Sequence, residues 1–241
     1  MTAFEYSPGL SIQGFNAPLS LSKFKLIAFD MDSTLISIEC IDEIADAVGR
    51  KADVAAITEA AMRGEITDFK DSLRRRLALL KGVTLADMER VYTERLKINP
   101  GAAELIAACQ KAGMKVLLVS GGFTFFADRV KARLNIDFAR SNQLEIADDE
   151  LTGGLVMQSW GDICDGAEKR RTLLEVASLL GITASECIAM GDGANDLPMM
   201  KACSEAGGLS VAYHAKPKVR EQAMVAINDG GLDRLLEVVQ P

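Results

Sequence analysis

Two aspartates one residue apart, Asp30 and Asp32, directly follow an apolar run at 25–29. The run predicts a buried parallel strand, and ligands of open α/β sheets bind beyond the carboxyl ends of the strands. Two carboxylates held this close repel each other unless a cation or a proton intervenes. The pair therefore predicts a functional site at a strand end.

Two further apolar runs also end in polar, glycine-rich turns, Ser120-Gly121-Gly122 and the segment 191–196. At the same edge of a sheet, these turns and the aspartate pair would build one site. Glycines allow tight turns and let backbone N–H groups approach an anion closely. Lys169, at the start of a predicted helix, could supply positive charge for that anion.

This set of residues predicts phosphoryl transfer to a carboxylate. Mg²⁺ takes oxygen ligands, and its expected ligands are the Asp30 and Asp192 side chains and the main-chain carbonyl of Asp32. We expect Asp30 to attack phosphorus and form an aspartyl-phosphate. Asp32 would donate a proton to the leaving alcohol and later accept one from the hydrolytic water.

Charge on the equatorial phosphoryl oxygens also needs donors. We expect these donors to be Ser120, a backbone N–H near Gly121, and Lys169.

The elements that position these residues follow from the hydrophobic pattern. After residue 99, helices are predicted at 102–112, 123–134, 167–180, 195–203, 216–223 and 231–239, strands at 115–119, 187–190, 209–213 and 224–227, and a hairpin at 143–158. Alternating helices and strands are typical of an α/β fold with a doubly wound parallel sheet.

The stretch 37–98 carries only helical spacing, with one helix at 53–62 ending near Gly64 and others starting at Thr67 and Thr84. Since it offers no strand, we expect an inserted helical cap over the carboxyl edge of the sheet. The predicted organisation is an arm or short strand at 1–24, a core at 25–36 and 99–241, and the cap at 37–98.

Composition limits the class of protein. A chain of 241 residues that is 49% hydrophobic can bury a large core. Its net charge of −7 argues against nucleic acid as a partner. The sequence offers no apolar window of the ~18 residues that a membrane helix needs and no secretory signal. Five cysteines scattered singly predict a reduced, cytoplasmic protein. Both a monomer and a homodimer are compatible with the sequence.

Four segments in order resemble the motifs of haloacid-dehalogenase-type phosphatases. They are Asp30-x-Asp32-x-Thr34, the Ser120 turn, Lys169, and Gly191-Asp192-Gly193-x-Asn195-Asp196. The resemblance covers about 25–240 and implies a Rossmann-like core with a cap. It also implies a Mg²⁺-dependent phosphatase that works through an aspartyl-phosphate.

Within this family, the segments 30–35, 39–45, 72–76 and 119–123 are similar to those of members that act on phosphoserine. The resemblance implies hydrolysis of O-phospho-L-serine to L-serine and phosphate, the last step of serine biosynthesis. It implies that Glu39 meets the substrate ammonium, Arg76 meets its carboxylate, and Asn195 helps to hold the phosphate. We expect Asp196 to orient Asn195 or Lys169 rather than to bind the metal.

Two other functions are compatible with parts of the pattern. A related phosphotransferase or broader phosphatase could pass the phosphoryl group to another acceptor such as homoserine. A regulatory protein could bind metal and phosphate without turnover, but the intact set of Asp30, Asp32, Lys169 and Asp192 argues against it. The single histidine, His214, lies far from every motif, so a histidine-dependent phosphatase is not expected.

Overall fold

Alternate residues of strand β4 (Leu26–Phe29) pack into separate hydrophobic cores, one on each side of the central sheet. The core on one face contains Ile27 and Phe29, and the core on the other contains Leu26 and Ala28. Since both faces are covered, all four residues are buried. This is why the strand reads as an unbroken apolar run rather than an alternating one.

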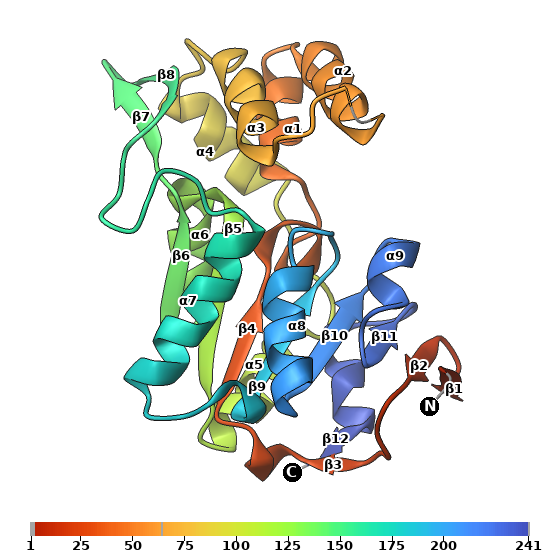
Figure 1. Cartoon of the computed structure of the whole chain (residues 1–241). Helices are drawn as coiled ribbons and strands as arrows, with labels where there is room; N and C mark the ends of the chain where they lie inside the picture. Colours follow the sequence, from red (N-terminus) through yellow and green to blue (C-terminus); the bar gives the residue numbers. More distant parts are fainter. Residues whose placement is uncertain (1–2, 64, 241) are drawn as a thin grey trace.

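The computed structural model describes residues 3–63 and 65–240 (Figure 1). Within these residues, eight strands form one sheet in the order β1-β2-β11-β10-β9-β4-β5-β6. Besides β4, they are β1 (Phe4–Ser7), β2 (Leu10–Ile12), β5 (Lys115–Phe123), β6 (Phe138–Asn142), β9 (Cys187–Gly191), β10 (Leu209–Tyr213) and β11 (Val225–Ile227). The strands from β11 to β6 run parallel, which confirms the predicted doubly wound α/β fold.

Helices cover both faces of this sheet (Figure 1). The core with Phe29 includes apolar residues of α5 (Ala102–Lys111) and α6 (Thr124–Leu134). The core with Ala28 includes those of α7 (Gly166–Leu179) and α8 (Leu197–Ala206). Because the chain goes from β4 to β5 in one direction and later to β9 in the other, the sheet has its topological switch point beside β4.

Four helices lie beyond the sheet edge at which β4 ends (Figure 1). They are α1 (Cys40–Ala47), α2 (Lys51–Met62), α3 (Phe69–Ala78) and α4 (Leu85–Glu94). The predicted end of the second helix near Gly64 lies outside the described residues. A hairpin of β7 (Leu144–Ala147) and β8 (Glu150–Leu155) joins this layer, because Leu151 exchanges backbone hydrogen bonds with Gly82 and Val83, both 2.8 Å.

The two connections to this helical layer run side by side. Ile36 and Ile98 form an isolated antiparallel bridge, and the Asn99 backbone N–H donates to the Leu35 carbonyl at 2.9 Å. The Asn99 side-chain amide donates to the carbonyl oxygens of Thr34 at 2.7 Å and Ile36 at 3.1 Å. Asn99 therefore ties the second connection to the segment that follows Asp30.

Some elements differ from the sequence-based expectations. The run at 231–239 is not one α-helix but a short 3₁₀ segment, Leu232–Glu237, followed by β12 (Val239–Gln240), which pairs with β3 (Leu19–Ser20). Leu232 and Leu235 are buried, and their spacing of three suits a 3₁₀ turn. The helix expected at 216–223 is the single turn α9 (Pro217–Arg220).

Residues 4–12 form the hairpin β1–β2, in which β2 adds an antiparallel strand to β11. Throughout the part of the chain that the structure covers, no helix combines the length and apolar content required to cross a membrane.

Candidate active site

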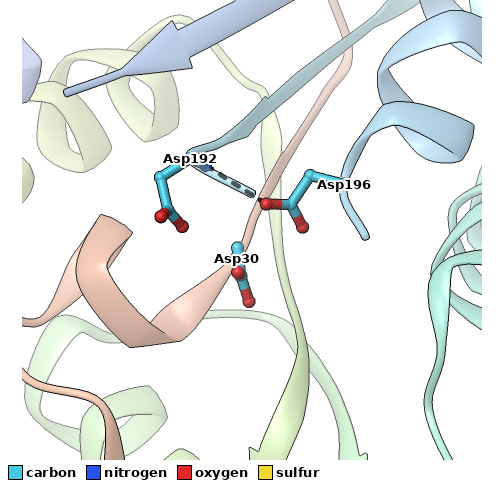
Figure 2. A group of neighbouring side chains, drawn as sticks. All are labelled: Asp30, Asp192 and Asp196. Atoms are coloured by element: carbon cyan, nitrogen blue, oxygen red, sulfur yellow. Dashed lines mark hydrogen bonds between the residues drawn. The ribbon is translucent and has the colours of Figure 1, made fainter. Parts of the chain in front are cut away.

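Asp30 and Asp192 follow the neighbouring strands β4 and β9, so the switch point of the sheet brings their side chains together. One oxygen each from Asp30, Asp192 and Asp196 lies within 4.8 Å of the others. Figure 2 shows the three carboxylates around one small space. Three carboxylates this close in a largely buried place need positive charge among them.

Lys169 supplies one such charge from the first turn of α7. Its ammonium is fully buried and lies 2.7 Å from both Asp30 Oδ1 and Asp196 Oδ1. Burial alone would lower the pKa of Lys169, but the carboxylates of Asp196 and Asp30 outweigh it and raise that pKa above its usual value. The side chain therefore stays a cation.

Asp196 has both of its oxygens bound by protein donors. Oδ1 accepts from Lys169, while Oδ2 accepts from the backbone N–H groups of Asp192 at 3.1 Å and Gly193 at 3.0 Å. A side chain at Gly191 would stand 2.3 Å from this carboxylate, so only glycine fits there. These contacts are consistent with the expectation that Asp196 orients Lys169 rather than serving as a metal ligand.

Ionisation of the other carboxyl groups of the site is unfavourable in this structure, as their raised pKa values indicate. Burial, followed by repulsion from Asp196, raises the pKa of Asp30 well above its usual range. Burial and the Glu39 carboxylate raise the pKa of Asp32 to about 7, and burial and Asp196 raise that of Asp192 to about 7. A divalent cation would relieve this cost, and carboxylate oxygens are the ligands that hard cations prefer. The donor set therefore fits a bound metal ion.

The segment Ser120-Gly121-Gly122, predicted as a turn, belongs instead to the last part of β5, where the pairing with β6 shifts register between Val119 and Phe123. Ser120 is buried, and its Oγ accepts from the Gly122 backbone N–H at 2.8 Å. Asn142 holds this segment of β5, because its side chain donates to the Gly121 carbonyl and accepts from the Cys164 N–H, both at 2.7 Å. A side chain at Gly122 would approach Asp32 Oδ2 to 2.8 Å, so the strand can pass this carboxylate only without one.

Glu39 and Arg76 reach the site from the helical layer. Glu39 precedes α1 and accepts from Ser33 Oγ at 2.7 Å, and Arg76 lies on α3. Burial lowers the pKa of Arg76, while Asp42 and Glu39 oppose this shift. Glu39 and Arg76 line a cavity of about 430 Å³ together with the residues that are predicted to bind the phosphate. Its lining includes Asp30, Asp32, Glu39, Arg76, Ser120, Gly121, Asp192 and Asn195.

Every sequence-predicted site residue thus lies in the cavity wall or, for Lys169 and Asp196, directly behind Asp30. The exposed His214 contacts the Gly230 carbonyl and does not line this cavity.

Sequence reasoning missed several contributors. Cys40 donates from Sγ to Asp32 Oδ1 at 2.9 Å, and Lys216 and Asp42 line the cavity. Cys40 and Asp42 are neighbours of Glu39 in the chain, and this proximity could have indicated that they reach the site. Nothing in the sequence gives such an indication for Asn142 and Lys216, because each reaches the site from another segment.

The fold and this constellation define the class of protein. The sequence matches the haloacid dehalogenase-like hydrolase family over residues 27–201, and the chain belongs to that family. The predicted resemblance is therefore confirmed.

Individual relatives with curated names narrow the comparison to one kind of enzyme within this family. A phosphoserine phosphatase of Polaromonas sp. is 68% identical over 240 residues, which is 100% of both chains. One from Idiomarina loihiensis is 47% identical and covers 90% of this chain and 96% of its own.

Solved structures agree with these relatives. A phospho-aspartyl intermediate analogue of phosphoserine phosphatase superimposes with a TM-score of 0.80 at 36% identity, covering 90% of this chain and 99% of that one. A substrate-bound phosphoserine phosphatase complex gives a TM-score of 0.80 at 35% identity with the same coverage.

Proposed function

We propose that this chain hydrolyses O-phospho-L-serine to L-serine and phosphate with Mg²⁺ as its cofactor, as the last step of L-serine biosynthesis. The observation that carries the proposal is one cavity lined by Asp30 from the sheet and by Glu39 and Arg76 from the helices. A phosphorylated amino acid carries a phosphate, an ammonium and a carboxylate, and this cavity offers a partner for each. The relative that is 68% identical supports the same substrate.

In the first half of the reaction, Asp30 attacks phosphorus and the bond to the seryl oxygen breaks. Lys169 and the Met31 N–H, both 2.7 Å from Oδ1, fix the orientation of the Asp30 carboxylate. Asp32 gives a proton to the leaving oxygen, so L-serine departs neutral at its hydroxyl and Asp30 carries the phosphoryl group.

In the second half, Asp32 accepts a proton from the water that attacks the aspartyl-phosphate. This releases phosphate and restores Asp30. Ser120, the N–H near Gly121, Lys169 and Asn195 hold the phosphoryl oxygens during both transfers. Mg²⁺ held by Asp30, Asp192 and the Asp32 carbonyl would offset the charge that collects on these oxygens.

The helices at 37–98 act as the cap in this proposal, with the core at 25–36 and 99–241. Closure of such a cap over the ligand excludes water during the first transfer. All five cysteines are free and buried, which supports the proposed cytoplasmic location.

Phosphate release from phosphoserine, phosphothreonine and glucose 6-phosphate, each with MgCl₂ or EDTA, tests the proposal. We expect phosphoserine to be the best substrate and EDTA to abolish turnover. Adding homoserine tests the alternative acceptor, since phosphohomoserine would be visible by ³¹P NMR. A preference for the sugar phosphate, or full activity in EDTA, would contradict the proposal.

Replacing the nucleophile gives a second test. Asp30→Asn keeps the size of the side chain but removes the attacking carboxylate, so we expect turnover to vanish. Circular dichroism should show an unchanged fold. Acid-quenched wild-type enzyme should hold ³²P from labelled phosphoserine, and the variant should hold none. Labelled variant protein would exclude Asp30 as the site of attachment.

A further inference from the structure

One carboxylate oxygen in the cavity has no partner. Among residues 3–63 and 65–240, Asp42 Oδ1 is the single buried side-chain oxygen or nitrogen without a hydrogen bond. Leaving a buried acceptor unsatisfied costs about 1–3 kcal/mol, and more for a charged group. Such atoms are rare in native structures and call for an explanation.

The other acids near Asp42, on α1 and just before it, do have partners. Arg95 donates to Glu43 at 2.7 Å and to Asp46 at 2.5 Å, and Ser33 donates to Glu39 at 2.7 Å. Asp42 differs from Glu43 and Asp46 in lining the cavity. It lies one helical turn beyond Glu39, so the two side chains can share a face.

The missing donor does not come from the nearby protein. Arg76 lies close enough for its charge to act on Asp42, yet its Nε donates to the Ser72 carbonyl at 3.4 Å. Because Asp42 lines the cavity, a donor on a bound substrate could take this place. In phosphoserine the phosphate and the carboxylate are acceptors, and the ammonium carries three N–H donors.

We infer that Asp42 binds the α-ammonium of phosphoserine together with Glu39 and thereby makes the enzyme selective for amino-acid phosphates. The inference rests on the proposed function. Glu39 Oε1 already accepts from Ser33, so the Asp42 carboxylate adds a second acceptor for the three N–H donors of the ammonium beside Glu39 Oε2. Arg76 is left free to grip the substrate carboxylate with its planar fork.

The test compares variants on substrates that lack one head group at a time. Asp42→Asn is assayed on phosphoserine, on phosphoethanolamine, which lacks the carboxylate, and on 3-phosphonooxypropanoate, which lacks the ammonium. Asp53→Asn makes the same charge change at an exposed position in the first turn of α2 and is the matched control. Asp42→Ala repeats the measurement without any acceptor oxygen.

We expect Asp42→Asn to lower kcat/KM by about ten-fold or more on phosphoserine and phosphoethanolamine, as for a lost charged hydrogen bond. Activity on 3-phosphonooxypropanoate should change by less than about two-fold. Losses confined to the two substrates with a carboxylate would assign Asp42 to the positioning of Arg76 and overturn the inference. Equal losses on all three, or none, would overturn it as well. If the wild type fails on phosphoserine itself, the proposed function fails instead.

Discussion

Lys169 illustrates how single residues set the chemistry of this site. Its ammonium has no exposed surface and lies between two carboxylates at equal distances of 2.7 Å. A buried charge is tolerable only when it is paired, and removing one partner typically costs about 3–5 kcal/mol. Loss of the lysine would therefore leave the carboxylates of Asp30 and Asp196 buried without their partner, at the same atoms with which it would orient Asp30.

Arg76 and Arg75 allow a matched prediction on one helix. Arg76 lines the cavity, whereas Arg75 is exposed and pairs with Asp71. We expect Arg76→Ala to lower kcat/KM on phosphoserine by about 10- to 150-fold, because a charged hydrogen bond is worth about 1.5–3 kcal/mol. Arg75→Ala should stay near wild type.

p-Nitrophenyl phosphate separates head-group binding from transfer, because it lacks the amino-acid part. Its hydrolysis should fall much less than that of phosphoserine in Arg76→Ala. Equal losses on both substrates would remove Arg76 as a contact of the substrate carboxylate.

At the scale of elements, the paired connections at Ile36 and Ile98 determine how the helical layer meets the segment that follows Asp30. The Asn99 side chain satisfies two carbonyl oxygens there, those of Thr34 and Ile36. These carbonyls belong to the segment that follows Asp30, so we expect any movement of the helices to reach the Asp30 carboxylate through them.

Asn99→Ala should therefore give a different result from Arg76→Ala. We expect kcat to fall on phosphoserine and on p-nitrophenyl phosphate alike, because the segment after Asp30 is disturbed whatever the substrate. Thermal unfolding should also report a loss of about 1–3 kcal/mol from two unsatisfied acceptors. A selective loss on phosphoserine would contradict this role.

The sequence was sufficient for features that depend on local pattern. The three apolar runs that precede Asp30, Ser120 and Asp192 predicted three parallel strands side by side, and the sheet confirms this with β9, β4 and β5 as neighbours. The turn predicted at Ser120 was wrong, because β5 continues to Phe123. Contacts between distant segments left no such pattern. The Asn142 bonds to the Ser120 segment and the Cys40 bond to Asp32 depend on packing, so the sequence did not reveal them.

The same reason explains the errors in secondary structure. The leucines at 232 and 235 suit either kind of helix, and pairing of Val239 with Leu19 ended the helix early. The hairpin at the amino terminus became part of the main sheet because β11 offered an unpaired edge.

For the whole molecule, the raised carboxyl pKa values predict a pH-dependent stability. The pKa of Asp192 is about 7 in the folded protein against 3.8 ordinarily, so the folded state binds more protons than the unfolded one between these values. The protonated Asp192 side chain therefore favours the folded state. This contribution to the free energy of unfolding is fully present below pH ~4 and is lost as pH rises through about 7. Asp192→Asn should remove this dependence.

Metal-free protein provides the measurement. Unfolding in urea should show the variant gaining on the wild type from pH 5 to pH 8. Adding MgCl₂ should stabilise the wild type at pH 8, by about 2.7 kcal/mol at a hundred-fold excess over Kd, and the variant less. A constant difference between the two proteins across pH would contradict the prediction.

The contacts of Lys169 have a consequence for synthesis in the cell. One ammonium joins residues from the early, middle and late parts of the chain, Asp30, Lys169 and Asp196. A nascent polypeptide that has not yet emerged past Asp196 lacks part of this junction. We therefore expect phosphatase activity to appear only after Asp196 has left the ribosome, late in synthesis of the polypeptide.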